Sequence, residues 1–199
     1  MRVSSPGRSV TGMLILMVAV TQAASVSRQQ ADSFAKKIAL IQQHGTRAST
    51  GTVRTTVSES ELNSWFTYDA SSSLPTGVTA PRITMNGDRT LTGVATVDLD
   101  AMAKSRASGS AFDVWNFIGG RVPVTVMGRL HARGGRVRFE LLEANIARVP
   151  VPRRVVEELV DYYSRTPDHP RGVRLDQEFE LPARIQQIEI NPGAAIVVQ

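Results

Sequence analysis

Cysteine is absent from the 199-residue chain, so no disulfide can stabilise it and no cysteine near residue 23 can carry a lipid. A chain of this length can still bury a sizeable hydrophobic core. We therefore expect a domain that is held together by its core alone.

Motifs of the common catalytic families are also missing. The sequence contains no H-E-x-x-H, no G-x-S-x-G and no glycine-rich phosphate loop after a strand. The three histidines, His44, His131 and His169, fall in a predicted helix end, strand and loop. Residues 33–36 spell S-x-x-K, but the K-T-G element that accompanies this motif in penicillin-recognising enzymes is absent, which favours an ordinary helix surface. We predict a protein that is not an enzyme and uses no cofactor.

A metal site is not expected either. Asp98 and Asp100 are the closest candidate pair of ligands, but no further ligands follow at a useful spacing. We interpret the two aspartates as a solvated strand end.

The chain lacks a hydrophobic run long enough to cross a membrane, because the apolar run at residues 13–20 is far shorter than the about 20 residues required. Arg2 and Arg8 precede this run, and Thr21-Gln22-Ala23 offers small residues where signal peptidase cleaves. We expect residues 1–23 to be a signal peptide cleaved near Ala23, which exports the protein to the periplasm or the cell exterior. An uncleaved membrane anchor is the alternative.

The net charge of +5 is a mild basic excess. It is compatible with peripheral contact to an anionic lipid surface or with nucleic-acid binding. Export and the spread of the arginines along the chain argue against nucleic acid, and a solvated basic surface is the simplest interpretation.

Two helices are predicted in the N-terminal part. Within an N-terminal helix and linker at residues 24–51, the spacing of Phe34, Ile38 and Ile41 predicts a helix over 29–43, with Asp32 or Ser33 as candidate capping residues near its start. Residues 58–61, Ser-Glu-Ser-Glu, form a capping box that opens a second helix.

Residues 52–199 are predicted to be an antiparallel sheet domain. Alternating apolar residues predict strands over 122–132 and 136–149, joined at Gly134-Gly135, and a further strand over 173–181. A final hairpin is predicted over 184–198, with its turn at Asn191-Pro192-Gly193. Strands over 78–85 and 90–99 are expected to turn at Asn86-Gly87, with a bulge near Gly93.

An amphipathic helix is expected after Pro150-Val151-Pro152, because proline ends the preceding strand ladder. Over residues 153–165, Val155, Val156, Leu159 and Val160 lie on one face. The fold class that follows is α+β.

Three motifs give the chain a resemblance to a known family. They are T-V-S-E-x-E-L-N at 56–63, V-P-V-P at 149–152 and L-P-x-x-I-x-x-I-x-I at 181–190. The chain resembles small bacterial envelope proteins that look like half of a tubular lipid-binding (TULIP-like) domain. The resemblance implies a long-stranded, highly curved antiparallel sheet wrapped around one amphipathic helix, with an apolar ligand between them and no catalytic residues.

Two functions remain open from the sequence. The first is non-catalytic binding of a lipid or other long apolar ligand in the cell envelope, in a groove whose candidate lining is Trp65, Phe66, Phe112, Trp115, Ile118 and Leu159. The second is a solid-core envelope scaffold that contacts a protein partner through a sheet edge or the 112–118 patch. For Trp65 and Phe66 taken singly, packing in the core is the better interpretation. The 112–118 segment is either a helix plugging the core or a mobile cover.

Overall fold

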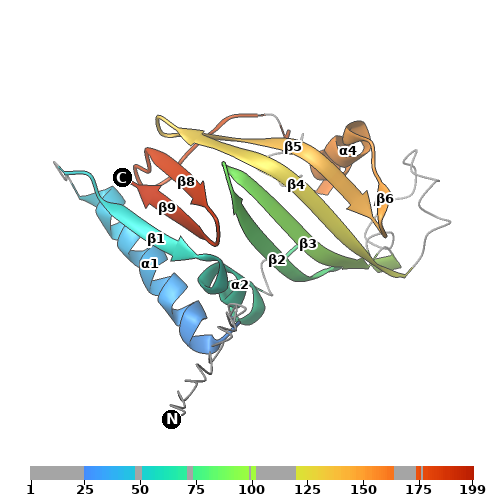
Figure 1. Cartoon of the computed structure of the whole chain (residues 1–199), viewed down its shortest axis with the longest axis horizontal. Helices are drawn as coiled ribbons and strands as arrows, with labels where there is room; N and C mark the ends of the chain where they lie inside the picture. Colours follow the sequence, from blue (N-terminus) through green and yellow to red (C-terminus); the bar gives the residue numbers. More distant parts are fainter. Residues whose placement is uncertain are drawn as a thin grey trace, which may run out of the picture.

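The computed structural model describes residues 25–47, 51–70, 74–98, 100–101, 120–163, 174–175 and 177–199 (Figure 1). The fold is α+β and is dominated by an antiparallel sheet, which in the described part of the chain has nine strands. The expected signal peptide at 1–23 and the 112–118 segment lie outside the described residues.

Four long strands form the larger part of the sheet. They are β2 (Val78–Gly87), β3 (Thr90–Asp98), β4 (Arg121–Arg133) and β5 (Arg136–Ile146), and they pair in chain order. Two short strands, β6 (Val149–Pro150) and β7 (Phe179–Glu180), pair with the ends of β5. The hairpin between β4 and β5 turns at Gly134-Gly135 as predicted, with both glycines at positive φ.

Three shorter strands form a second unit beside the first. β1 (Arg54–Ser58), β9 (Ala194–Val198) and β8 (Gln187–Asn191) pair in that spatial order. β8 joins β4 through the pair Arg133 and Gln187, and a bridge between Asn86 and Pro192 ties the β8–β9 turn to β2. The predicted final hairpin, turning around Asn191-Pro192-Gly193, is thus confirmed.

The helices contact different parts of the sheet (Figure 1). α1 (Arg28–Thr46) lies along β1, α2 (Glu59–Tyr68) contacts α1 and β2, and α4 (Arg153–Tyr163) contacts β5. The capping box at the start of α2 is confirmed. Among the described residues, no helix is long and apolar enough to cross a membrane.

The larger part of the sheet has one apolar face. Cross-strand partners share a face, and the strand register aligns rows such as Met85, Leu91, Gly128 and Leu141 across all four strands. We call the following set the apolar face: Ile83, Met85, Leu91, Gly93, Ala95, Val97, Val122, Val124, Val126, Gly128, Leu130, Ala132, Val137, Phe139, Leu141, Ala144 and Ile146. The opposite, polar face carries mainly threonine, arginine and glutamate side chains.

Two hydrophobic clusters pack α1 and α2 against the strands. One packs Ile38 and Ile41 of α1 against Ile185, Ile188 and Val197. The other brings Met85, Leu91 and Leu130 of the apolar face together with Ile190 and Ala195 of the short strands and Leu62 of α2. The core therefore runs from α1 through the short strands to one end of the apolar face.

One predicted turn and one predicted bulge in the β2–β3 hairpin were wrong. The β2–β3 turn is Asp88-Arg89, both at positive φ, and not Asn86-Gly87, which still belongs to β2. The register shifts lie between Thr79 and Arg82 and between Met85 and Gly87, rather than at Gly93.

Two predicted strand limits were also wrong. β5 does not continue through residue 149, because the chain reverses at Ala147-Arg148 and β6 pairs back onto β5. Of the strand expected over 173–181, the described residues pair only at Phe179–Glu180. The helix predicted over 29–43 is confirmed as α1, but its N-cap is Ser27, whose hydroxyl accepts a hydrogen bond from Gln30 N–H, and not Asp32 or Ser33.

Candidate functional site

A buried carboxylate lies where α1, α2 and β1 meet. The side chain of Glu61 is only 6% exposed, and Lys37 Nζ lies 2.7 Å from Oε1 and 2.8 Å from Oε2. Ser33 Oγ donates to Oε1 at 2.5 Å, and Ser58 N–H donates to Oε2 at 2.8 Å. Lys37 Nζ also donates to the backbone oxygen of Thr56 at 2.6 Å. This arrangement ties two helices to an edge strand.

The pKa of Glu61 reflects this environment. Burial alone would raise the pKa, but hydrogen bonds from Lys37, Ser33 and Ser58 outweigh that effect and hold it below its usual range. The carboxylate is therefore charged and fully engaged at neutral pH, as expected of a structural group and not of a general base. Lys37, and not the Lys36 of the S-x-x-K match, is the lysine that shares this cluster with Ser33.

The T-V-S-E-x-E-L-N motif at 56–63, which includes Ser58 and Glu61, also closes the outer edge of β2. Asn63 is 4% exposed; its Oδ1 accepts from Ile83 N–H at 2.7 Å and its Nδ2 donates to Ile83 C=O at 2.8 Å. Glu59 Oε2 accepts from Met85 N–H at 2.8 Å. The spacing within T-V-S-E-x-E-L-N thus has a structural explanation: its polar side chains cap a helix, bind Lys37 and pair with a strand edge.

The fold brings together only some of the residues that were predicted to line an apolar ligand groove. Trp65 lies between Phe34 and Phe66, with ring centroids 5.4 Å apart in both pairs, at the contact of α1 with α2. Phe112, Trp115 and Ile118 lie outside the described residues. Leu159 belongs to α4, which contacts β5, whereas α2 contacts β2 at the other side of the four-stranded unit (Figure 1).

The apolar face offers a larger candidate surface than these aromatic residues. Met85, Leu91 and Leu130 at one end are covered by the short strands and α2. Further along, Ala95 and Val97 of β3 and Val124 and Val126 of β4 are only half-buried. The alternation of these strands was predicted from the sequence, but the predicted lining consisted of other residues, namely Trp65, Phe66, Phe112, Trp115, Ile118 and Leu159.

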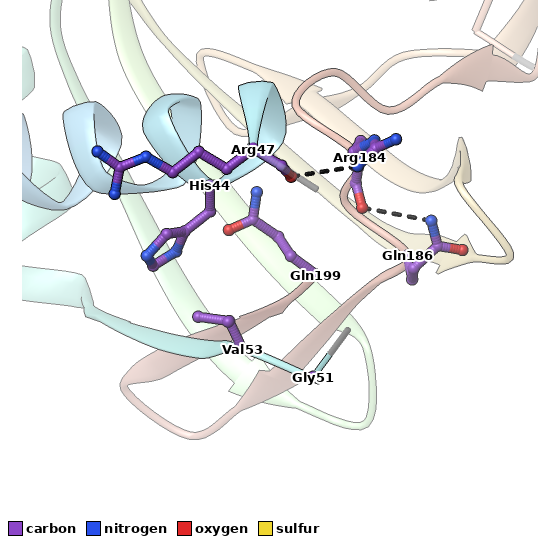
Figure 2. A pocket seen from close by; sticks show the side chains of 7 residues that line it. All are labelled: His44, Arg47, Gly51, Val53, Arg184, Gln186 and Gln199. Carbon is purple, nitrogen blue, oxygen red and sulfur yellow. Dashed lines mark hydrogen bonds between the residues drawn. The ribbon is translucent and has the colours of Figure 1, made fainter. Parts of the chain in front are cut away.

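A pocket with a volume of about 290 Å³ lies at the C-terminal end of α1 (Figure 2). We call it the polar pocket, because most of the residues that line it are polar or charged. The residues that line it come from three segments distant in sequence, and they are His44, Arg47, Gly51, Val53, Arg184, Gln186 and Gln199. No local motif links these three segments, so the sequence alone does not predict this pocket.

The charged residues of the polar face form local pairs. His131 Nε2 lies 2.8 Å from Glu140 Oε2, and Arg129 Nη1 lies 3.5 Å from the same oxygen. The bond with His131 and the charges of nearby arginines lower the pKa of Glu140. His131 thus shares the polar face with arginines and lies in a strand, as predicted.

The two candidate metal-ligating aspartates are used structurally. Asp98 accepts from Ala101 N–H at 2.9 Å and pairs with Arg121 at 3.4 Å, and the bond from Ala101 together with Arg121 lowers its pKa. Asp100 Oδ2 accepts from Gly120 N–H at 3.0 Å. In the part of the chain that the structure describes, no three His, Cys, Asp or Glu side chains are grouped as metal ligands.

No protein-family model, curated protein or solved structure matches this chain.

Proposed function

We propose that the protein binds a lipid or another long apolar molecule, without catalysis, in the cell envelope. The observation that carries the proposal is the apolar face: one side of four long paired strands with no charged side chain. Such a surface must be covered to be stable in water. The short strands and α2 cover one end of it. Val122 and Ala144 are buried as well, so the surface assigned to the ligand is the half-buried part formed by Ala95, Val97, Val124 and Val126.

The middle of the apolar face suits an elongated ligand. Its central rows combine small residues, Gly93, Ala95 and Ala144, with Val124 and Val126 of β4. Small side chains let an acyl chain approach the backbone, and aliphatic neighbours supply the contacts that ligand sites require. Strands of this length span tens of ångströms at about 3.3 Å per residue, which is enough for a fatty acyl chain.

α4 is assigned the role of a wall beside the ligand. It contacts β5, and its Val155, Val156 and Val160 are half-buried while Arg153 and Arg154 are exposed. In the proposed arrangement the sheet curves around α4, as the TULIP-like resemblance implies, and the ligand lies between them. The mild basic excess of the chain would favour contact with anionic membranes, from which the ligand would be taken.

A matched pair of variants tests the proposal. Ala95 belongs to the apolar face and is half-buried, whereas its neighbour Val94 points to the polar face and is 41% exposed. Ala95→Trp should fill the ligand space and weaken binding of a fluorescent fatty-acid probe by about tenfold or more, whereas Val94→Trp should leave binding unchanged. Equal binding by both variants, or no binding by the wild-type protein, would contradict the proposal.

One observation favours the second candidate, an envelope scaffold. Leu142, Val149 and Phe179 are 42%, 63% and 36% exposed, and all three belong to β5 or to the short strands paired with it. The three residues are spread along the outer edge of β5, with Phe179 beside Val137 and Val149 beside Ile146. Exposed apolar residues along a sheet edge are typical of protein contacts. On this account the purified protein would be free of lipid, and Leu142→Lys would abolish binding of a protein partner.

A further inference from the structure

The polar pocket at the end of α1 is built by a close approach of two segments. A Cβ atom added to Gly45 would lie 2.5 Å from Ala183 Cα, so only glycine lets α1 pack onto the turn at residues 182–185. In that turn Ile185 N–H donates to Pro182 C=O, and Ala183 and Arg184 both have positive φ. Non-glycine residues adopt this conformation at a cost, and such positions gather at functional sites.

The side-chain amide of Gln199 forms the inner wall of the pocket, and its orientation is fixed. Nε2 donates to Ile41 C=O at 2.8 Å and to Ala183 C=O at 2.6 Å. Exchanging the amide nitrogen and oxygen would place an oxygen against two carbonyl oxygens, so Oε1 must be the atom left over. The backbone oxygen of Gln199 is engaged by Val53 N–H at 2.9 Å.

Two buried atoms of the pocket residues lack a hydrogen-bond partner. They are Gln199 Oε1 and His44 Nδ1. A buried polar atom without a partner costs about 1–3 kcal/mol, so a molecule in the pocket that satisfied both atoms would be favoured. Oε1 can only accept a hydrogen bond, which requires a donor on that molecule, whereas an imidazole nitrogen can donate or accept.

The charge of the pocket sets a second requirement. Arg47 and Arg184 line it, and none of its described lining residues is acidic. Arg184 Nη1 donates to Arg47 C=O at 3.2 Å, which holds the two segments together, and Figure 2 shows that the Arg47 and His44 side chains both come from the end of α1.

We infer that this pocket binds a small oxyanion that carries at least one hydroxyl group, of the hydrogen phosphate class. The anion pairs with the guanidinium group of Arg47, and the O–H group of the anion donates to Gln199 Oε1. A second oxygen of the anion contacts His44 Nδ1. Inorganic phosphate and the phosphate ester of a polar headgroup share this chemistry. The inference is independent of the ligand proposed for the apolar face, since the pocket shares no residue with that face.

Phosphate and sulfate provide a direct test. Both are tetrahedral anions of similar size, but at neutral pH phosphate retains an O–H group and sulfate does not. NMR titrations at constant ionic strength should show inorganic phosphate shifting the signals of His44 and the Gln199 side-chain amide. Sulfate should bind about tenfold more weakly, because Gln199 Oε1 would face an anion with no donor.

Two arginine variants provide the matched control. Arg47→Gln should weaken phosphate binding by about tenfold, through loss of a charge-assisted hydrogen bond, whereas Arg82→Gln on the polar face should leave it unchanged. Glycerol phosphate is the third probe: tighter binding than inorganic phosphate identifies a headgroup as the source, and equal binding identifies the free anion. Equal affinities for phosphate and sulfate, no effect of Arg47→Gln, or no binding of phosphate would each overturn the inference.

Discussion

The side-chain amide of Asn63 pairs with the backbone of Ile83 as a neighbouring strand would, accepting from its N–H and donating to its C=O. Two residues along β2, Glu59 accepts from Met85 N–H. Open strand edges are prone to pair with other chains, and native proteins block them. α2 therefore closes the outer edge of β2 with side chains instead of a further strand.

Asn63→Ala should lower the free energy of unfolding by about 1–3 kcal/mol, because it leaves two backbone groups of Ile83 without their partners. Asn86 is the control; it is exposed and donates to Thr92 Oγ1, so Asn86→Ala should change stability by no more than about 0.5 kcal/mol. Urea denaturation measures both. Similar losses from the two variants would show that the closed edge contributes nothing specific.

Gly128→Ala should destabilise the protein by about 1–3 kcal/mol, because the new Cβ would lie 2.1 Å from the ring of Phe139 and 2.7 Å from the backbone oxygen of Glu140. Gly93 lies on the same apolar face, and a Cβ there would be 3.4 Å from Ile83 Cδ1. Gly93→Ala should therefore be neutral or stabilising by up to about 1 kcal/mol. Thermal unfolding of both variants checks the prediction, and a larger loss at Gly93 would contradict it.

Acidification should weaken the contact of α1 with α2. The pKa of Glu61 lies below its ordinary value of 4.5, so the stabilisation it provides is complete above the unfolded-state pKa and is lost as the pH falls through the folded-state pKa. Glu61→Gln should cost about 1–3 kcal/mol at pH 7, and the difference from wild type should shrink below about pH 4.5. Denaturation curves between pH 7 and pH 3 measure this difference, and a gap that stays constant over that range would refute the assignment.

Local signals in the sequence predicted some elements well. The capping box at Ser58 needs only the four residues that form it, and Gly134-Gly135 supplies the positive φ that its turn requires. The turns at Asp88-Arg89, Ala147-Arg148 and Ala183-Arg184 contain no glycine, so the sequence does not mark them as positions of positive φ. Pairing within the fold holds these residues in a conformation that they seldom adopt. The β2–β3 turn was therefore predicted at Asn86-Gly87, which is the stronger turn signal in the sequence, and not at Asp88-Arg89, where the chain turns.

The candidate sites were harder to predict for a related reason. The alternation along β4 predicted which residues share a face, but not that Met85, Leu91, Gly128 and Leu141 would align in one row, since register between distant strands depends on the whole sheet. The polar pocket combines His44 with Gln199 through backbone contacts that leave no pattern in the sequence.

Native mass spectrometry of the protein, purified without detergent from its own cells, tests the central claim most directly. If the apolar face holds a lipid or another long apolar molecule, the spectrum should show a bound species that is lost after a detergent wash and is recovered by solvent extraction. A protein that carries only its own mass and binds no added fluorescent fatty acid would contradict the account.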